Sequence, residues 1–349
     1  MDVALVSYFY PTVTFGGASR HTYNLSKALS KHVKVTLYIP SILPKLQSEN
    51  PKIKGCGFIK QRGLALPSFA ISASLALDEH DIVHSMAGSG IFLKRIDVET
   101  FHHLDTVGFL PTIYYLEQRI CLKRAKHIIC VSEASKKDLL RIGLTSAKVS
   151  VIWNGIDTSV FKRVDGNLIR RRFGLEGKRV CLYVGDLGKR KNIGLLLKML
   201  KATPEDCYLL IVTGKANKQQ IERIAHRYGL EKSIIVSTNV SDVELPYYYS
   251  AADLFVLPSL IEGFGLVLLE AVAVGCPFVA MKVGIAPFLA RSGFGVTVND
   301  EESFIKECLK YLNNPIKLDD KSYEFVQQNF SWDIVAQRTL EIYNKILEA

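Results

Sequence analysis

The sequence lacks cysteines in any spacing that would mark a metal or redox site. Its seven cysteines include no CxxC pair, so a zinc site built from Cys and His is not supported. Most of them lie within apolar, periodic segments, as small buried residues do in a reducing compartment such as the cytoplasm. No basic stretch precedes the first apolar run, MDVALVSYF, and we therefore expect a buried strand there and no signal peptide.

Long uninterrupted apolar runs are also missing. The most apolar stretch, residues 258–281, is broken by Pro258, Glu262, Glu270 and Pro277. A membrane-spanning helix needs roughly 20 apolar residues with few or no charges, so we exclude a span here.

Sequence motifs for nucleic acids, dinucleotides and bound metals are absent as well. There is no RNA-recognition, zinc-finger or basic-zipper pattern, no GxGxxG fingerprint, no Walker A loop and no Asp-x-Asp motif. The net charge is nevertheless +10, and the first 155 residues hold 19 basic against 11 acidic side chains, the remainder 25 against 23. This basic first half fits a solvated surface, an anionic membrane surface or an anionic acceptor. Nucleic acid is supported by charge alone, and we expect no nucleic-acid partner.

Strand-like and helix-like segments alternate along the chain, which predicts an α/β protein. The 349 residues suffice for two domains. Two alternating series imply two doubly wound, Rossmann-like domains with parallel sheets and a ligand cleft between them. We expect residues 1–155 to form the first domain, 156–330 the second and 331–349 a C-terminal helix. Residues 157–177 are polar, and we expect them to be irregular.

The stretch from residue 258 to 281 carries two carboxylates in apolar surroundings. Its pattern predicts a glycine-containing turn, a short buried helix from Leu266 to Val274, and a buried strand. Glu262 would lie in the turn and Glu270 in the helix, where an isolated carboxylate is costly unless it is paired or hydrogen-bonded. In one interpretation, a distant Lys or Arg neutralises Glu270 or the side chain faces solvent. In the other, both carboxylates accept hydrogen bonds from a hydroxyl-rich ligand, and the turn offers N–H groups to an anion.

Two further loops follow predicted strands and precede predicted helices. Gly16 and Gly17 lie in TFGGASR, where two glycines would let backbone approach a ligand or simply make a turn. The loop GDLGKRKN, residues 185–192, places Lys189, Arg190 and Lys191 at the mouth of the second sheet. These cations either hold a diphosphate or form a solvated basic loop.

Histidines at strand ends are the remaining candidates. His102 and His103 follow the strand ending at Phe101, and Asp105 is two residues further on. Two histidines and an aspartate at the carboxyl end of a strand are typical of a site in the cleft, although a histidine there is also commonly structural. His84, at another strand end, is the weaker candidate.

Taken together, these positions resemble the retaining, nucleotide-sugar-dependent glycosyltransferases of the GT-B fold, the family-4 type. The resemblance covers nearly the whole chain in the family's order. It runs through TFGGASR, FHHLDT with the family's active-site histidine, VSEASKKDL, the crossover IWNGID, the phosphate loop GDLGKRKN and PSLIEGFGLVLLEA. The last motif, two glutamates separated by seven residues, is the specific one. Two positions depart from the family pattern: Asp186 stands where Arg is frequent, and Trp153 replaces a proline.

The resemblance implies a role for each domain and for named residues. The first domain would bind the acceptor and the second the donor, with the C-terminal helix crossing back to the first. Arg190 and Lys191 would neutralise the diphosphate, Glu270 would bind the ribose and Glu262 the donor sugar. The implied catalytic residues are His102, Glu262 and Lys191. The implied donor-binding residues are Gly16, Gly17, Gly185, Arg190, Lys191, Glu262, Gly263, Phe264, Gly265, Leu266 and Glu270.

The expected function is transfer of a hexose from a nucleoside diphosphate sugar to an acceptor hydroxyl, with retention of anomeric configuration. The resemblance implies no metal and no cofactor beyond the nucleotide sugar. The basic first half favours a lipid-linked or membrane-associated acceptor, and soluble sugar acceptors remain open. The alternative is a non-catalytic binder of nucleotide sugars or carbohydrates on the same fold. We expect the base to be recognised near Ser237 to Val240.

Overall fold

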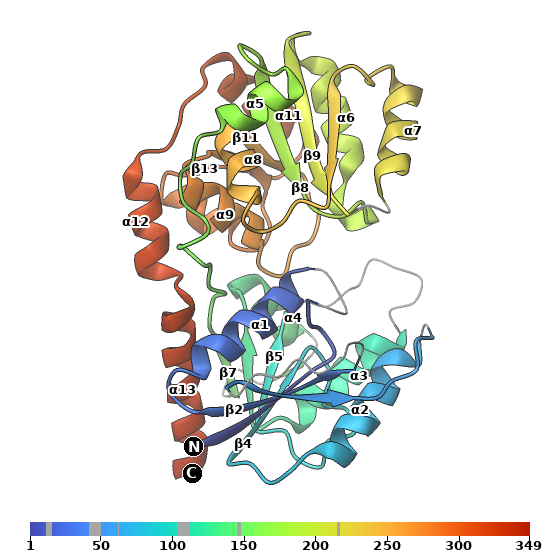
Figure 1. Ribbon diagram of the computed structural model, residues 1–349, viewed down its shortest axis with the longest axis vertical. Helices are drawn as coiled ribbons and strands as arrows, with labels where there is room; N and C mark the ends of the chain where they lie inside the picture. Colours follow the sequence, from blue (N-terminus) through green and yellow to red (C-terminus); the bar gives the residue numbers. More distant parts are fainter. Residues whose placement is uncertain are drawn as a thin grey trace. The chain divides into compact units, whose positions relative to one another are not determined.

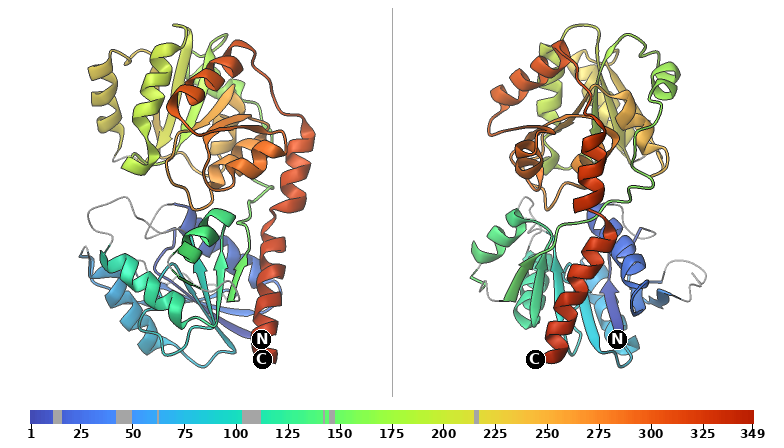
Figure 2. Two further views of the ribbon diagram at one scale, coloured as in Figure 1. Left: turned by 180° about the vertical axis from the view of Figure 1, so that it is seen from behind. Right: turned by 90° about the vertical axis from the view of Figure 1, so that its left-hand side faces the viewer.

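The structure is a computed structural model that describes residues 1–11, 16–41, 50–61, 63–102, 112–141, 143–144, 148–214 and 217–349. The chain forms two compact units, residues 1–155 with 332–349 and residues 156–331. Each unit is a parallel sheet flanked by helices (Figures 1 and 2). The predicted fold class, two Rossmann-like α/β domains, is therefore confirmed, and the last helix, α13 (Trp332–Glu348), belongs to the first unit.

The sheet of the first unit has the order β3-β2-β1-β4-β5-β6-β7, and neighbouring strands run parallel. Its strands are β1 (Asp2–Ser7), β2 (Lys34–Pro40), β3 (Lys52–Cys56), β4 (Ile82–Met86), β5 (Val98–Phe101), β6 (His127–Cys130) and β7 (Val149–Val151). Its other helices are α1 (Gly17–Leu29), α2 (Ala65–Ala76), α3 (Thr112–Arg124) and α4 (Glu133–Arg141).

The helices of the first unit lie on two faces of its sheet, each with its own apolar core. Helices α1 and α13 pack together and share a core with β1, β2 and β4. On the other face, residues of α2, α3 and α4 share a core with β1, β5 and β6. Helix α4 begins at a side-chain cap, because the Ser132 hydroxyl accepts a hydrogen bond of 3.0 Å from the Ser135 N–H.

The second unit repeats this plan with the strand order β10-β9-β8-β11-β12-β13. Its strands are β8 (Arg179–Val184), β9 (Cys207–Thr213), β10 (Ile234–Thr238), β11 (Leu254–Leu257), β12 (Phe278–Met281) and β13 (Gly295–Val298). Its α-helices are α5 (Asn167–Phe173), α6 (Ile193–Ala202), α7 (Lys218–Tyr228), α8 (Leu245–Ala251), α9 (Leu266–Val274), α10 (Ala286–Arg291), α11 (Glu301–Asn313) and α12 (Asp320–Asn329), and η2 (Lys189–Lys191) is a 3-10 helix. Helices α6, α7 and α11 share one core with the sheet, and α9 packs against α8 and α12.

The expectation that residues 157–177 are irregular was wrong in part, because α5 lies within them. This short helix carries three consecutive arginines, which gave no apolar period in the sequence. Arg170 holds it in place through an ion pair of 2.7 Å with Asp253 and a hydrogen bond of 2.9 Å to the Ala251 carbonyl. Tertiary contacts of a charged side chain, and not local propensity, therefore fix this helix.

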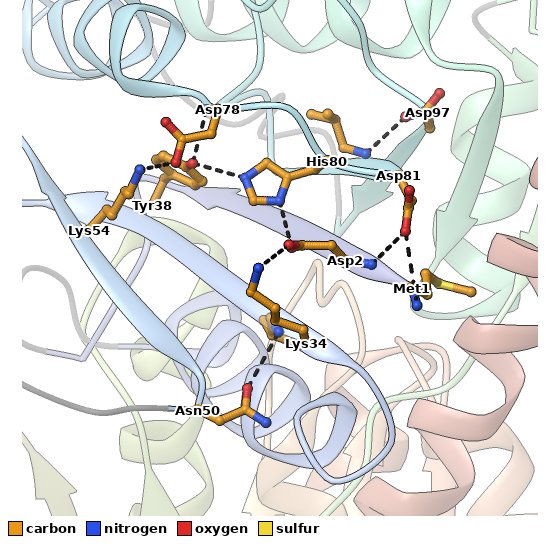
Figure 3. A network of polar contacts seen from close by, with 12 residues as sticks. Met1, Asp2, Lys34, Tyr38, Asn50, Lys54, Asp78, His80, Asp81 and Asp97 are labelled. Carbon is orange, nitrogen blue, oxygen red and sulfur yellow. Dashed lines mark hydrogen bonds and ion pairs between the residues drawn. The ribbon is translucent and has the colours of Figure 1, made fainter.

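A polar network ties together the amino-terminal ends of the first unit's strands (Figure 3). Asp2 on β1 pairs with Lys34, its register partner on β2, at 2.5 Å, and its other oxygen lies 2.7 Å from His80 Nδ1. The second nitrogen of His80 lies 3.0 Å from the Tyr38 hydroxyl. The contacts of Asp2 join the start of β1 to the start of β2 and to the segment before β4.

A buried carboxyl, Glu99 on β5, makes the stability of the first unit depend on pH. Its Oε1 accepts a hydrogen bond of 2.7 Å from the Gly88 N–H. Burial raises the pKa of Glu99 to about 7, and the hydrogen bond from the Gly88 N–H opposes part of this rise. A carboxyl with a raised folded-state pKa loses stabilising free energy as pH rises from its unfolded value of 4.5 to about 7.

We therefore expect Glu99→Gln to stabilise the first unit more at pH 8 than at pH 5. The difference in unfolding free energy between variant and parent should grow by about 2 kcal/mol between these pH values, because glutamine does not ionise. Urea unfolding at both pH values measures it, with the exposed Glu79→Gln as the control. An equal difference at pH 5 and pH 8 would show that Glu99 does not titrate as described.

Candidate functional site

The second unit brings two of the predicted motifs to neighbouring strand ends. Strands β8 and β11 are hydrogen-bonded neighbours where the strand order changes direction. The loop 185–192 follows β8, and the glutamate-containing turn 258–265 follows β11. Doubly wound sheets bind ligands at the carboxyl ends of the strands at such a switch point. The fold therefore places both motifs at the position where a ligand is expected.

The loop after β8 is shaped by its own polar groups. Gly185 has a φ of 155°, and a Cβ there would lie 2.8 Å from the Tyr183 hydroxyl. The Asp186 carboxylate accepts a hydrogen bond of 2.8 Å from the Gly188 N–H, and the Asp186 carbonyl accepts one of 2.6 Å from Tyr183. Asp186, which departs from the family pattern, thus builds the turn that precedes η2.

Two cations and a carboxylate meet where the two motifs adjoin. The Leu260 N–H donates to the Arg190 carbonyl at 2.7 Å, which joins the loops. Lys191 Nζ lies 2.5 Å from Glu262 Oε1, and Arg190 Nη1 lies 3.5 Å from Glu262 Oε2. Lys191 is buried, with 8% of its surface exposed. Arg190 also faces Asp186 at 3.6 Å, so each cation has at least one anionic partner.

This arrangement fixes positive charge in a partly desolvated position. Moving a lysine and a carboxylate from water into a buried position costs desolvation free energy. The surrounding loops must therefore hold the pair in a favourable geometry. Glu262 keeps both cations close, and a carboxylate has about four lone-pair sites, so hydroxyl groups of a ligand can still bind to it. The site can thus receive a diphosphate on Arg190 and Lys191 while Glu262 contacts a sugar.

Glu270 lies within α9 and is buried, with 2% of its surface exposed. Its Oε2 accepts a hydrogen bond of 2.7 Å from the Tyr249 hydroxyl on α8. The Tyr249 ring is held at 5.5 Å from Phe255 and at 6.5 Å from Phe161. The alternative that Glu270 faces solvent is excluded, and the Tyr249 hydroxyl is one of its partners.

The turn before α9 presents an uncapped helix start. Gly265 precedes the helix in the left-handed conformation with a φ of 92°, and no side chain caps the first turn. The carbonyl of Phe264 is held from behind by a hydrogen bond of 2.8 Å from the Ile285 N–H. Free N–H groups at a helix start attract anions, and here they follow directly after Glu262 and Gly263.

The backbone of Gly284 lies close behind the Phe264 carbonyl of this turn. A Cβ at Gly284 would lie 2.2 Å from the Phe264 carbonyl oxygen, and its φ is 51°. We expect Gly284→Ala to displace the turn and to lower donor affinity about 10-fold or more. The matched control is Gly293→Ala, where φ is 88° but a Cβ meets open space. Equal donor affinity of both variants, measured by calorimetry, would contradict the role of Gly284.

In the first unit, the predicted glycines begin α1. Gly16 precedes the helix with a φ of 137° and no side-chain cap, and Gly17 is its first residue. The described part of the first turn holds no acidic residue. A helix start of this kind is also suited to an anion.

His102 is buried in a cluster of rings at the end of β5. The His21 ring lies 5.0 Å from His102 and 5.5 Å from Trp332, both edge-on. His21 Nδ1 lies 2.7 Å from the Asn154 side-chain oxygen, and burial lowers the pKa of His21 to about 4 in spite of this contact. His21 is thus a neutral ring that positions His102. His103 and Asp105 lie outside the described residues.

His84 does not join this cluster as a ligand-facing group. It lies inside the core between the Tyr343 hydroxyl at 2.6 Å and the Thr100 hydroxyl at 2.7 Å. Burial, with a smaller effect of His21, lowers the pKa of His84 to about 3. His84 is therefore structural.

The residues that sequence reasoning missed are those that support the predicted ones: Tyr183, Tyr249, Gly284 and His21. Tyr183 and Tyr249 lie in β8 and α8, which are mostly apolar, whereas His21 lies in the mixed helix α1. Gly284 lies in the turn between β12 and α10, and no sequence pattern sets these residues apart. In the predicted base-recognition segment, the Ser237 hydroxyl lies 2.7 Å from that of Tyr248.

Two parallel, doubly wound units, with a basic loop joined to a two-glutamate turn, are the arrangement expected of a GT-B glycosyltransferase. Residues 166–328 match the family model described as Glycosyl transferases group 1, and residues 15–160 match the one described as Glycosyltransferase Family 4. The first half of the chain therefore matches a glycosyltransferase family 4 model and the second half a group 1 model, and together they support a glycosyltransferase of the GT-B type.

Individual glycosyltransferases are also similar to this chain in sequence or in fold. D-inositol 3-phosphate glycosyltransferase 2 of Catenulispora acidiphila is 28% identical over 305 residues, covering 77% of this chain and 71% of that protein. Sucrose-phosphate synthase from Thermosynechococcus elongatus has a TM-score of 0.85 at 22% identity over 99% of each chain. Anabaena HepE in complex with UDP-glucose has a TM-score of 0.81 at 19% identity, covering 99% of this chain and 100% of that one. The two solved structures support the fold.

Proposed function

We propose that this glycosyltransferase moves a hexose from a nucleoside diphosphate sugar to an acceptor hydroxyl with retention of anomeric configuration. The observation that carries the proposal is the pair of cations, Arg190 and Lys191, fixed by Glu262 beside the uncapped start of α9. This is a site for a doubly charged phosphate group with a hydroxyl-rich ligand attached. The UDP-glucose bound by HepE is a molecule of this kind.

The chemical difficulty is departure of the diphosphate while positive charge develops on the sugar. Fixed cations and N–H dipoles stabilise the leaving group without reorganising during the reaction, which is the largest single source of rate in many enzymes. We propose that Arg190, Lys191 and the start of α9 supply this stabilisation and that no divalent metal is required.

Glu262 is proposed to orient the donor sugar and not to act as the nucleophile. A retaining glycosidase uses two carboxyl groups about 5 Å apart, one of which attacks the sugar. Glu262 is engaged by Lys191 at 2.5 Å and by Arg190 at 3.5 Å, and these cations reduce its nucleophilicity. Attack on the same face, assisted by the leaving phosphate, fits this arrangement better. His102 remains the proposed catalytic residue of the first unit.

The first unit is proposed to bind the acceptor. Its excess of basic residues suits an anionic acceptor, such as a phosphorylated sugar or a lipid phosphate. The relative from Catenulispora is named for a phosphorylated acceptor, D-inositol 3-phosphate. A lipid-linked acceptor at a membrane is our preferred form of this proposal.

A donor screen tests the proposal. UDP-, GDP- and ADP-sugars are compared by thermal shift, and nucleotide release from the selected donor is then followed with and without acceptor, with and without EDTA. We expect one base to stabilise the protein, acceptor-dependent release, no loss in EDTA, and a product with the donor's anomeric configuration by NMR. Donor binding without release under any acceptor would favour the non-catalytic alternative.

A further inference from the structure

The helices α2 and α3 of the first unit expose an apolar surface that the proposed reaction does not use. We define the α2–α3 face by its exposed aliphatic residues, Ile59, Leu64, Ile71, Leu75, Leu116 and Ile120. Leu75 is 85% exposed and Leu116 is 58% exposed. Single exposed aliphatic residues are common on proteins, but a group of them on adjoining elements marks an interaction surface.

Helix α2 is unusual because it contains no charged residue along its whole length, ALPSFAISASLA. Its inner side packs Leu66, Phe69 and Ala73 into the core. Leu64, Ile71 and Leu75 follow at spacings of seven and four residues on the outer side, which is a stripe along one helix face. A helix in contact with water alone would carry charged residues on this side.

Two other segments on the same side of the sheet also expose aliphatic residues. The Ile59 N–H donates to the Ser68 hydroxyl on α2 at 2.9 Å, so Ile59 lies against the helix. On α3, Leu116 and Ile120 are four residues apart and therefore lie on one face. Both helices contribute buried residues to the same core, on the same side of the sheet (Figure 1).

The exposed charges on α3, beside its aliphatic residues, are positive. Helix α3 carries Arg119, Lys123 and Arg124, while its only carboxylate, Glu117, is buried. The carboxylates Asp78 and Glu79 lie beyond the end of α2, and Asp78 is paired with Lys54. Aliphatic groups bordered by cations are complementary to an anionic bilayer, where the aliphatic groups enter the acyl boundary and the cations meet the headgroups.

We infer that the α2–α3 face docks the protein on an anionic membrane surface. Within the described residues, no helix is both long and apolar enough to cross a bilayer. The inference deepens the proposed function, because it supplies the surface on which a lipid-linked acceptor would be met. It does not depend on the donor site, and its test needs no donor.

Sedimentation of the full chain with vesicles tests the inference. The vesicles contain phosphatidylcholine alone or with about one third phosphatidylglycerol, at low and at high salt. We expect binding to the anionic vesicles only, weakened by salt as surface attraction is screened. The double variant Ile71→Ser with Leu75→Ser should bind these vesicles at least about 10-fold more weakly than the parent, since two aliphatic side chains no longer enter the bilayer.

The matched control carries the same change on the second unit. Leu168 and Ile316 are 51% and 53% exposed there, and Leu168→Ser with Ile316→Ser should bind vesicles as the parent does. Activity toward a soluble acceptor should be unchanged in both double variants, which separates this inference from the proposed reaction. Equal vesicle binding of the two double variants, no anionic preference, or a parent dimer that Ile71→Ser with Leu75→Ser converts to a monomer would overturn the inference.

Discussion

Replacing Lys191 by alanine should lower kcat/KM for the nucleotide sugar about 10²- to 10³-fold. Lys191 is the buried cation of the site and is held at 2.5 Å from Glu262. Removing one fixed group that stabilises a developing oxyanion costs about 3 kcal/mol in well-studied enzymes, which corresponds to this loss of rate. The effect should fall mainly on kcat, because the charge on the diphosphate grows in the transition state.

Lys189→Ala is the matched control for this change. Lys189 is a neighbour in the same 3-10 helix, but it is exposed to solvent. Its removal changes the net charge equally and should lower kcat/KM only about 2-fold or less, because an exposed charge is screened. If Lys191→Ala reacts as fast as the parent, Lys191 does not have the assigned role. If both variants lose the same activity, the loss comes from the net charge and not from the buried position of Lys191.

Lys191→Ala also leaves Glu262 with one fewer cationic partner, so stability must be followed alongside activity. Removing one member of a buried ion pair destabilises a protein by several kcal/mol at most, and Arg190 at 3.5 Å reduces that cost here. Lys191→Ala combined with Glu262→Gln removes both charges. The double variant should regain stability relative to Lys191→Ala but not activity, which distinguishes a catalytic from a structural loss.

The second large effect is expected from Glu270→Ala, which should weaken donor binding about 10- to 100-fold. A hydrogen bond to a charged group contributes about 1.5 to 3 kcal/mol of binding free energy. We propose that the ribose hydroxyls donate such bonds to the Glu270 carboxylate. The loss should appear mainly in the donor KM. Calorimetric titration with the nucleoside diphosphate measures the change in affinity directly.

Tyr249→Phe provides the control for Glu270→Ala. It removes the hydroxyl that donates to Glu270 Oε2 at 2.7 Å but leaves the carboxylate in place. If the role of Glu270 is to bind ligand, Tyr249→Phe should weaken the donor much less than Glu270→Ala. Equal effects of the two changes would indicate that the pair serves only to hold α8 against α9.

The sequence predicted the larger plan because that plan rests on local patterns. Alternating strands and helices lead directly to the two parallel sheets, and Gly265 and Gly275 bracket α9 as helix-breaking glycines do. The same reasoning missed α2, because a helix whose outer side is as apolar as its inner side has no amphipathic period. It missed α5 because the contacts that hold it come from Asp253 and Ala251, far along the chain.

The pairing inside the candidate site was beyond sequence reasoning for a similar reason. Lys191 and Glu262 are 71 residues apart, and only the adjacency of β8 and β11 brings them together. The sequence showed that Glu270 needed a partner, but nothing near it identified Tyr249. In contrast, the strand pattern alone predicted that loops 185–192 and 258–265 lie at the carboxyl ends of strands.

The most direct test of the account compares a nucleoside diphosphate with its deoxyribose counterpart, in the parent and in Glu270→Ala. If the ribose hydroxyls satisfy the buried carboxylate, the parent should bind the deoxy compound about 10-fold more weakly, and Glu270→Ala should bind both with nearly equal Kd. Undiminished discrimination in Glu270→Ala would contradict the assignment of the donor site to this glutamate.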